Sequence, residues 1–546
     1  MSIPFLVNEA GVPPATRARA RRVARGSARV DRSLALAMGL AALVAALVTY
    51  WAYRNDLILT YYDAQSHLNI ARRVLDSRTP GLAQLGTVWL PFPHLLMLPL
   101  TANDFLWRSG LAGSVVGLFS FVGTVGALFL TVRRLTGRES AAWVALAALI
   151  LNPNMLYLHT TALTEPVLLA TMTGSAYFLL RWGQDRANGD LMLAGLLSAL
   201  AVGSRYDGWF FALVCGGITV LVAWRRSRRY AVVESLALTF LAAPLYAMIG
   251  WFGYNWIIFG NPLEFQGGRY SAQFQQNAIA QSEGLATKHN LALSALSYGW
   301  AVVDNTGWLV LALGVAGLLT YGVKTRFRLE AAIPYAFLAA LPFNILALWL
   351  GQTIVRVPQL PQDNILSSFN IRYGVLLLPG VALFVGWLYA TLVARLGRRV
   401  VLPAFVLLLA LQGGLWLASD VRSSAVIADG LDFQRAFPER EQIAAFLQRE
   451  YDGGGILIDD SQNHVILRAE IDMREYIATF SGPLWRATLA EPEDHARWIV
   501  LDMANRDDQV ATAVSELGIF RQGYELMYTS GTLAVYRQID NTVDVP

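Results

Sequence analysis

The sequence predicts a polytopic α-helical membrane protein that ends in a small soluble α/β domain. Of its 546 residues, 55% are hydrophobic and only 15% are charged, whereas soluble domains carry about 25% charged residues. The mean hydropathy is +0.42, and many apolar runs approach the ~20 residues that a spanning helix requires. Basic residues occur in every second connection between these runs. These three observations exclude a large soluble core.

The apolar runs predict about eleven membrane spans. The first run follows an Arg-rich polar leader and is long enough to cross the bilayer, so we interpret it as a retained signal anchor. The predicted spans fall at 33–53, 109–132, 140–158, 162–181, 190–204, 208–224, 231–256, 300–322, 331–350, 372–393 and 399–419.

The basic residues predict how these spans are oriented, because cytoplasmic connections are enriched in Lys and Arg. The basic connections carry Arg17, Arg19, Arg21, Arg22, Arg25 and Arg29, then Arg133, Arg134 and Arg138, then Arg181 and Arg186, then Arg225, Arg226, Arg228 and Arg229, then Lys324, Arg326 and Arg328, and lastly Arg395, Arg398 and Arg399. We therefore expect a cytoplasmic N-terminus in a multi-pass plasma-membrane protein. The net charge of +4 is then a topology signal and does not indicate nucleic-acid binding.

This orientation divides the chain into three parts. Residues 1–30 form a basic N-terminal segment that is mobile or lies on the cytoplasmic face, and 31–419 form the membrane domain. The segments predicted to lie outside are 54–108, 159–161, 205–207, 257–299, 351–371 and everything after 420. The three long outer loops, 54–108, 257–299 and 351–371, are rich in aromatic residues, Pro and amides. We expect them to be re-entrant or interfacial pieces over an external cavity.

After residue 420 the pattern changes to that of an α/β domain on the outer face. Residues 438–449 and 507–517 are predicted to be helical. ILIDD at 456–460, RWIVLDM at 497–503, YELMYTS at 524–530 and TLAVYRQ at 532–538 are predicted strands. The last two strands are joined through a Ser-Gly turn, which predicts a hairpin.

The stretch YYDAQSHLNIARRVLD at 61–76 predicts a short helix on the membrane surface. Ala64, Leu68, Ala71 and Leu75 recur at helical spacing on one face. Asp63 lies in or just before the first turn and shares a face with His67, four residues on. We interpret Asp63 as the chemical centre of a membrane enzyme.

Glu165, in TALTEPVLLA, opens the fourth predicted span at the same outer surface as Asp63. Either carboxylate alone has a structural interpretation as a helix N-cap. Carboxylates that face a cavity at a membrane surface are costly and tend to be functional. Two of them at one surface favour a catalytic role, and a base role for Asp63 requires burial or the proximity of Glu165.

Several arginines lie on the predicted outer side, where the enrichment of basic residues in cytoplasmic connections does not explain them. They are Arg72, Arg73, Arg205, Arg269, Arg356 and Arg372. For a single arginine, snorkelling or pairing with an acid is the simpler interpretation; for the group, we expect at least one to bind an anion such as a lipid phosphate. The motifs SRYDGW and GGRYSA add Tyr206, Asp207 and Tyr270 to the candidate substrate-binding residues.

Other common chemistries lack their motifs. The six histidines show no metal-ligand spacing, and there is no Walker loop, no helix-opening GxGxxG and no GxSxG. We therefore predict no resident cofactor and leave a divalent ion open. His67 and His94 are candidates for the outer pocket. The single cysteine, Cys215, lies in an apolar run and excludes an intrachain disulfide.

With these residues in place, the chain resembles the GT-C membrane glycosyltransferases, in particular the branch of protein O-mannosyltransferases and lipid A aminoarabinose transferases. The resemblance covers roughly residues 33–390 by layout. Its motifs are YYDAQSHLNIARRVLD with Asp63, VWLPFPHLL followed by Arg108, TEPVLL with Glu165, SRYDG with Arg205, and more weakly FGNPLEF and IRYGVLLLPG with Arg372.

The resemblance implies transfer of a sugar from a polyprenyl-phosphate donor at the outer face of the membrane, usually with inversion. Asp63 would accept a proton from the acceptor hydroxyl or orient it, and arginines would hold the departing phosphate. The sugar is open, and so is the acceptor, which is a protein, a lipid or a glycan. Two alternatives remain from the residues alone, a transporter or flippase of a lipid-linked saccharide and a scaffold that binds through 420–546.

Overall fold

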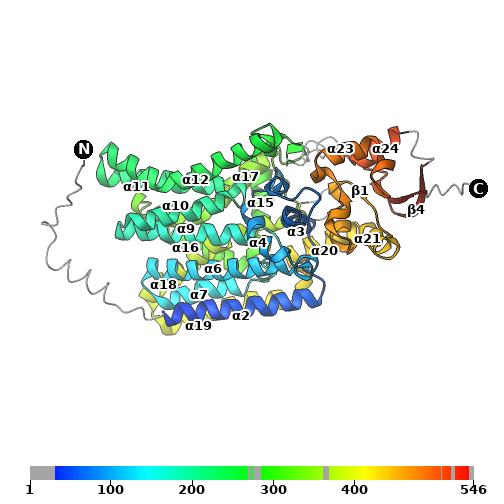
Figure 1. The fold of residues 1–546 in the computed structure, drawn as a ribbon. Coiled ribbons are helices and arrows are strands. Elements are labelled where there is room, and N and C mark those ends of the chain that lie inside the picture. The colour runs from blue at the N-terminus through cyan, green and yellow to red at the C-terminus, as the bar shows by residue number, and fades with distance from the viewer. Residues whose placement is uncertain are drawn as a thin grey trace, which may run out of the picture.

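The computed structural model describes residues 31–268, 271, 273–274, 285–360, 368–505, 507–517 and 523–539. Long helices run side by side in a bundle, and a C-terminal sheet region packs against one end of it, which we call the sheet end (Figure 1). The predicted fold class, a polytopic helical membrane protein with a small C-terminal α/β region, is confirmed.

The bundle is built from helices of very different length. They are α2 (Arg32–Arg54), α6 (Leu111–Thr136), α7 (Glu139–Ile150), α8 (Pro153–Leu158), α9 (Glu165–Asp185), α10 (Asn188–Val202), α11 (Tyr206–Ser227), α12 (Tyr230–Phe259), α15 (Leu291–Thr306), α16 (Trp308–Thr325), α17 (Ala340–Trp349), α18 (Leu378–Leu396) and α19 (Arg398–Ala418). Short helices at the sheet end are α3 (Tyr62–Leu75), α4 (Phe92–Thr101), α5 (Asp104–Arg108) and α13 (Glu264–Gly267). The 3-10 turns of this part are η1 (Leu82–Leu85), η2 (Leu329–Ala331), η3 (Ile333–Leu338) and η4 (Ile371–Leu377).

Seven helices in the described residues are long and apolar enough to cross a membrane, with four shorter apolar helices beside them. The seven are Arg32–Arg54, Leu111–Thr136, Tyr206–Ser227, Tyr230–Phe259, Trp308–Thr325, Ile371–Leu396 and Arg398–Ala418. Each predicted span coincides with one or more helices, and the count of eleven crossings stays a prediction.

Two predicted spans are broken. The span expected at 140–158 is divided into α7 and α8, because Asn152 caps a new helix with Pro153 at its first position. The span expected at 300–322 is divided at Gly307, whose φ of +78° ends α15. Helix α15 begins at Leu291, so the last part of the predicted loop 257–299 is helical. Hydropathy reports average polarity and does not reveal these breaks.

Helix α3 forms where the sequence predicts it. It contacts α4 of the bundle and α22 of the sheet region. Ala64, Leu68 and Ala71 are fully buried, whereas Leu75 is 42% exposed. The periodicity therefore predicted a buried face correctly, and protein covers that face. The placement of the helix at the membrane surface stays a prediction.

The C-terminal region holds a five-stranded sheet in the order β2-β1-β3-β5-β4. β1 is parallel to β2 and β3, while β5 is antiparallel to β3 and β4. Its strands are β1 (Ile456–Ile458), β2 (Tyr476–Ile477), β3 (Trp498–Asp502), β4 (Tyr524–Ser530) and β5 (Leu533–Gln538). Its helices are α20 (Ala425–Ala436), α21 (Glu439–Glu450), α22 (Asn463–Arg468), α23 (Pro483–Ala490) and α24 (Gln509–Glu516), with 3-10 turns η5 (Val421–Ser423), η6 (Asp460–Gln462), η7 (Met473–Glu475), η8 (Thr479–Ser481) and η9 (Pro492–Asp494). Four strands and two helices follow the prediction, and the two-residue β2 was missed because it is too short for a periodic signal.

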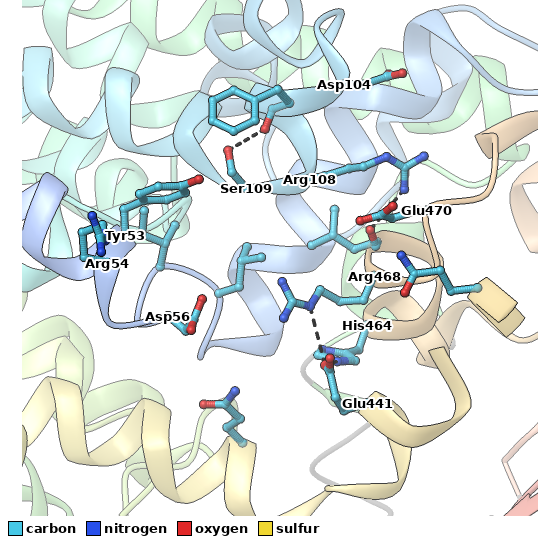
Figure 2. A pocket seen from close by; sticks show the side chains of 16 residues that line it. Tyr53, Arg54, Asp56, Asp104, Arg108, Ser109, Glu441, His464, Arg468 and Glu470 are labelled. Atoms are coloured by element: carbon cyan, nitrogen blue, oxygen red, sulfur yellow. Dashed lines mark hydrogen bonds and ion pairs between the residues drawn. The ribbon is translucent and has the colours of Figure 1, made fainter. Parts of the chain in front are cut away.

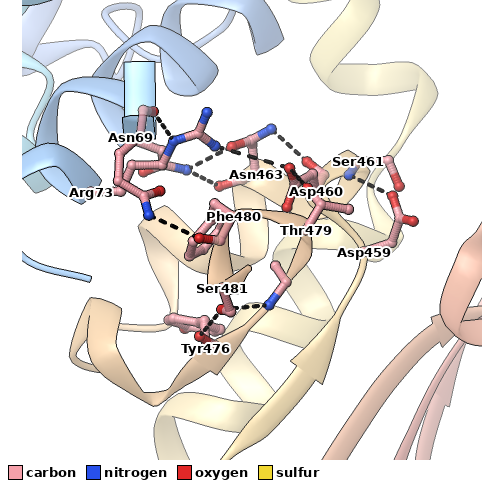
Figure 3. Close-up of polar contacts among 12 residues, drawn as sticks. Asn69, Arg73, Asp459, Asp460, Ser461, Asn463, Tyr476, Thr479, Phe480 and Ser481 are labelled. Atoms are coloured by element: carbon pink, nitrogen blue, oxygen red, sulfur yellow. Dashed lines mark hydrogen bonds and ion pairs between the residues drawn. The ribbon is translucent and has the colours of Figure 1, made fainter. Parts of the chain in front are cut away.

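Polar contacts join α3 to the sheet region (Figure 3). The amide of Asn69 donates to the carbonyl of Asn463 at 2.9 Å. The guanidinium of Arg73 lies 5.2 Å from the ring centre of Phe480 and 4.0 Å from a carboxylate oxygen of Asp460. These contacts fix one side of α3. Asp63 lies on another side of the same helix.

A polar cavity of about 660 Å³ separates the end of α2 and α5 from α21 and α22 (Figure 2). Arg108 lies on its wall and donates to the carbonyl of Ile471 at 3.0 Å. The arginine after the VWLPFPHLL motif therefore attaches the bundle to the sheet region.

Candidate active site

The structure brings Asp63 and Glu165 to the same arginine. Asp63 is in the first turn of α3, Glu165 is the first residue of α9, and Arg372 lies in η4. Arg372 donates through Nη2 to Asp63 Oδ2, and through Nε to Glu165 Oε1 at 3.1 Å. Neither carboxylate is an N-cap, since Tyr61 and Thr164 occupy those positions.

Arg205 extends this arrangement from the turn before α11. Its Nη1 atom donates to the same Glu165 Oε1 at 3.1 Å, and its Nε atom donates to Asp207 Oδ2 at 3.1 Å. We call Asp63, Glu165, Arg205, Asp207 and Arg372 the charged cluster. It holds three carboxylates and two guanidinium groups at the sheet end of an apolar bundle.

Burial within the charged cluster is uneven. The side chain of Glu165 is fully buried and that of Arg372 is 5% exposed, but that of Asp63 is 34% exposed. Charged groups inside a protein are retained at a cost of several kcal/mol each unless they are paired. The cluster therefore has a closed interior around Glu165 and one open carboxylate, Asp63, which a reactant can reach.

Aromatic and amide side chains hold the charged cluster in place. The Arg372 guanidinium lies 5.0 Å from the ring centre of Tyr61 and 5.2 Å from that of Tyr373. Asn344 donates to Asp207 Oδ1 at 3.3 Å. Tyr373 and Asn344 are not among the predicted site residues, although Tyr373 follows Arg372 in the IRYG motif and an amide inside an apolar span is a usable signal.

The two candidate histidines form a buried pair beside the charged cluster. His67 Nδ1 and His94 Nε2 are 2.8 Å apart, and the Trp89 ring packs on His67 at 4.6 Å between centres. Burial, together with the positive charges of Arg205 and Arg372, lowers the pKa of His67 to about 3. His67 is thus neutral, and the pair shares a hydrogen between an acceptor and a donor nitrogen.

A cavity of about 810 Å³ lies along α3, and none of the five residues of the charged cluster lines it. It is lined by one face of α3, by Trp89, by the end of α12 and by the sheet region. Trp89 is shared between the cavity and the histidine pair, and Tyr62, the neighbour of Asp63 in the chain, also lines it. Its size and position between two parts of the chain are typical of small-molecule sites.

Other predicted binding residues lie outside the charged cluster. Arg72 pairs with Asp76 at 2.5 Å and with Asp104 at 2.7 Å. Tyr206 donates its hydroxyl to the carbonyl of Val88 at 2.9 Å. The contacts of Arg72 attach α3 to α5. The contact of Tyr206 attaches α11 to the segment that contains Val88.

Three more residues were predicted to bind substrate. Arg356 is buried, and its backbone pairs with that of Phe369. Arg269 and Tyr270 lie outside the described residues. Among the residues that the structure describes, no three His, Cys, Asp or Glu side chains are grouped as a metal site.

Comparison with known proteins shows what the chain is similar to. Residues 116–259 match the model of a family described as dolichyl-phosphate-mannose-protein mannosyltransferase. No curated protein matches the chain by sequence. The crystal structure of ArnT from Cupriavidus metallidurans bound to undecaprenyl phosphate matches with a TM-score of 0.56 and 15% identity, over 92% of this chain and 98% of that one. The apo structure of the same protein matches with a TM-score of 0.51 and 14% identity, over 90% and 98%.

A third match is the oligosaccharyltransferase AglB from Archaeoglobus fulgidus, in complex with an inhibitory peptide and a dolichol-phosphate, with a TM-score of 0.45, 12% identity, and 94% and 75% coverage. The chain thus shares its fold with ArnT, and residues 116–259 are similar to a family of membrane glycosyltransferases. The resemblance to GT-C membrane glycosyltransferases that the motifs indicated is therefore confirmed as a similarity.

Proposed function

We propose that the protein transfers a sugar from a polyprenyl-phosphate-linked donor to a hydroxyl acceptor, with inversion, at the outer face of the cytoplasmic membrane. The observation that carries the proposal is the charged cluster, in which Asp63 is the open carboxylate and Arg372 ties it to Glu165. The matching family is described by a dolichyl-phosphate-linked sugar, and ArnT binds undecaprenyl phosphate. Both support a lipid-phosphate donor.

In the proposed reaction, a bond forms between the acceptor oxygen and the anomeric carbon of the sugar. The bond from that carbon to the phosphate oxygen breaks on the opposite face, which inverts the configuration. Asp63 takes the proton from the acceptor hydroxyl or orients that hydroxyl, as general bases do. The polyprenyl phosphate leaves with the electron pair, and the nearby guanidinium groups of Arg205 and Arg372 stabilise its growing negative charge.

Glu165 has a different part in this proposal. Its Oε1 atom accepts hydrogen bonds from both arginines, so it fixes their guanidinium groups where the phosphate departs. Preorganised donors of this kind lower a barrier because they need not reorient during the reaction. The sequence motif identified Glu165 as catalytic, and its contacts support a positioning role.

The orientation of the protein is part of the same proposal. The alternation of basic connections places the N-terminus in the cytoplasm, and α2 carries the chain from there to the sheet end. The charged cluster and the C-terminal region then lie outside the cell, where lipid-linked sugars are used. The cavity of about 810 Å³ beside α3 is where we place one of the two substrates.

The test is transfer from a labelled lipid-linked sugar in vesicles that contain the purified protein. Asp63→Asn keeps the size of the side chain and is expected to lower the rate by about 100-fold or more. Asp104→Asn, a change of the same type at the same end of the bundle but outside the charged cluster, is the matched control. Unchanged transfer by folded Asp63→Asn protein would refute the assignment, and uptake of an intact saccharide without bond cleavage would indicate a transporter.

A further inference from the structure

A fourth carboxylate, Asp429, lies behind Arg372. It belongs to α20, the first α-helix after the bundle, and is only 4% exposed. Helix α20 packs against both α8 and η4, the turn that carries Arg372. No sequence motif points to this residue, because its role depends on contacts with segments far away in the chain.

Helix α20 is fixed on one side against α8 and on another against the turn that leads into α3. The backbone N–H of Val426 donates to Asn154 Oδ1 at 2.9 Å. At Gly430, a Cβ atom would lie 2.4 Å from Thr60 Oγ1, so only glycine allows the two segments to approach this closely. Asp429, between these two positions, therefore has little freedom to move.

The contacts of Asp429 lead to Arg372 through Tyr61. The Tyr61 hydroxyl lies 2.6 Å from the carbonyl oxygen of Val426 and 3.1 Å from Asp429 Oδ2. The ring of the same tyrosine faces the Arg372 guanidinium at 5.0 Å. Arg372 in turn holds Asp63 and Glu165.

The Tyr61 hydroxyl donates toward two acceptors, the carbonyl oxygen of Val426 and the Oδ2 atom of Asp429, so the two oxygens share one hydrogen. The charged and titratable groups that interact with Asp429 are Tyr61, Asp63, Tyr157 and Arg372. Burial raises the pKa of Asp429 to about 6, against the opposing effect of Arg372.

We propose that Asp429 is a positioning residue, which holds Tyr61 so that the ring keeps Arg372 in contact with Asp63 and Glu165. The effect of this residue on the rate rests on the proposed function, whereas its effect on the position of Arg372 does not. The C-terminal region then contributes directly to the geometry of the site through its first α-helix.

The test compares Asp429→Leu, which removes both hydrogen-bonding oxygens at similar size, with Asp429→Asn, whose side-chain oxygen still accepts from Tyr61. Asp432→Asn, one turn along the same helix, is the control. In an experimental structure of Asp429→Leu, Arg372 is expected to lose its contact with Asp63. In the transfer assay, kcat is expected to fall about tenfold for Asp429→Leu with KM for the donor unchanged within about twofold. Asp429→Asn is expected to keep at least about half of the wild-type kcat.

Two results would overturn the proposal. One is an Asp429→Leu structure in which Arg372 keeps its contacts with both Asp63 and Glu165. The other is an unchanged kcat in a variant that has lost these contacts. If the leucine variant does not fold, Tyr61→Phe removes only the hydroxyl and is judged by the same two measurements. If the wild-type protein transfers no sugar, the proposed function fails, and the position of Arg372 alone decides the inference.

Discussion

Glu165 and Arg372 are 207 positions apart in the chain, and the arginine Nε atom donates to the carboxylate Oε1 atom at 3.1 Å. The same oxygen accepts from Arg205 at 3.1 Å. Glu165 is fully buried, and it is the carboxylate that both guanidinium groups share, while Asp63 and Asp207 each pair with one of them. Among the residues that the structure describes, the second oxygen of Glu165 has no hydrogen-bond partner.

Glu165→Gln is expected to destabilise the fold by about 2 kcal/mol, because a neutral amide replaces the charged acceptor shared by Arg205 and Arg372, which then keep only Asp207 and Asp63 as anionic partners. Unfolding of the detergent-solubilised protein, followed by denaturant titration, measures this. Glu234→Gln, an exposed position on α12, is the control and should be neutral. Equal stability of the two variants would mean that the arginines find other partners.

Arg372→Lys is expected to lower the transfer rate by about 100-fold, since a single ammonium group cannot reproduce the two-sided donation to Asp63 and Glu165. Arg72→Lys is the matched comparison, because Arg72 is buried and ion-paired but lies outside the charged cluster. It should lower stability and leave kcat within about twofold of wild type. Similar kcat values for the two variants would contradict the assignment of the site.

The raised pKa of Asp429 predicts that the stability of the protein falls as the pH rises. Burial raises its pKa in the folded protein from 3.8 to about 6. Between these values the folded state binds more protons than the unfolded state, so stability is lost from about pH 4 to 6 and stays lower above pH 6. The free energy of unfolding is expected to fall by about 3 kcal/mol across this pH range. Asp429→Asn should remove this fall in denaturation curves measured across this range, while Asp432→Asn should keep it.

His67 predicts a pH dependence of the opposite sign. Its pKa falls from 6.5 to about 3 in the folded protein, so the unfolded state binds more protons below pH 6.5. Stability is therefore expected to fall as the pH drops, by about 2 kcal/mol between pH 6.5 and 5. His67→Asn should flatten this part of the curve, and His495→Asn, an exposed position, should not. A curve unchanged by His67→Asn would show that the histidine pair is protonated in the fold.

The sequence predicted much of the scaffold, because hydropathy and periodicity are local properties of the chain. Each predicted span coincides with helices, and the strand at 524–530 has the predicted bounds. The same local signals failed where a few residues change the backbone, as at Gly307. They also did not reveal what covers the buried face of helix 61–76, since an amphipathic pattern indicates that one face is covered but not which part of the protein covers it.

Asp63 and Glu165 were predicted from their positions at the starts of helices, but their common partner was not. Arg372 joins residues 309 and 207 positions away, and Tyr61 meets Asp429 across 368 positions. The sequence by itself determined the membrane class, the approximate elements and the two carboxylates. Only the tertiary structure decided which charges meet, because Coulomb and hydrogen-bond energies depend on distances between atoms and not on separation along the chain.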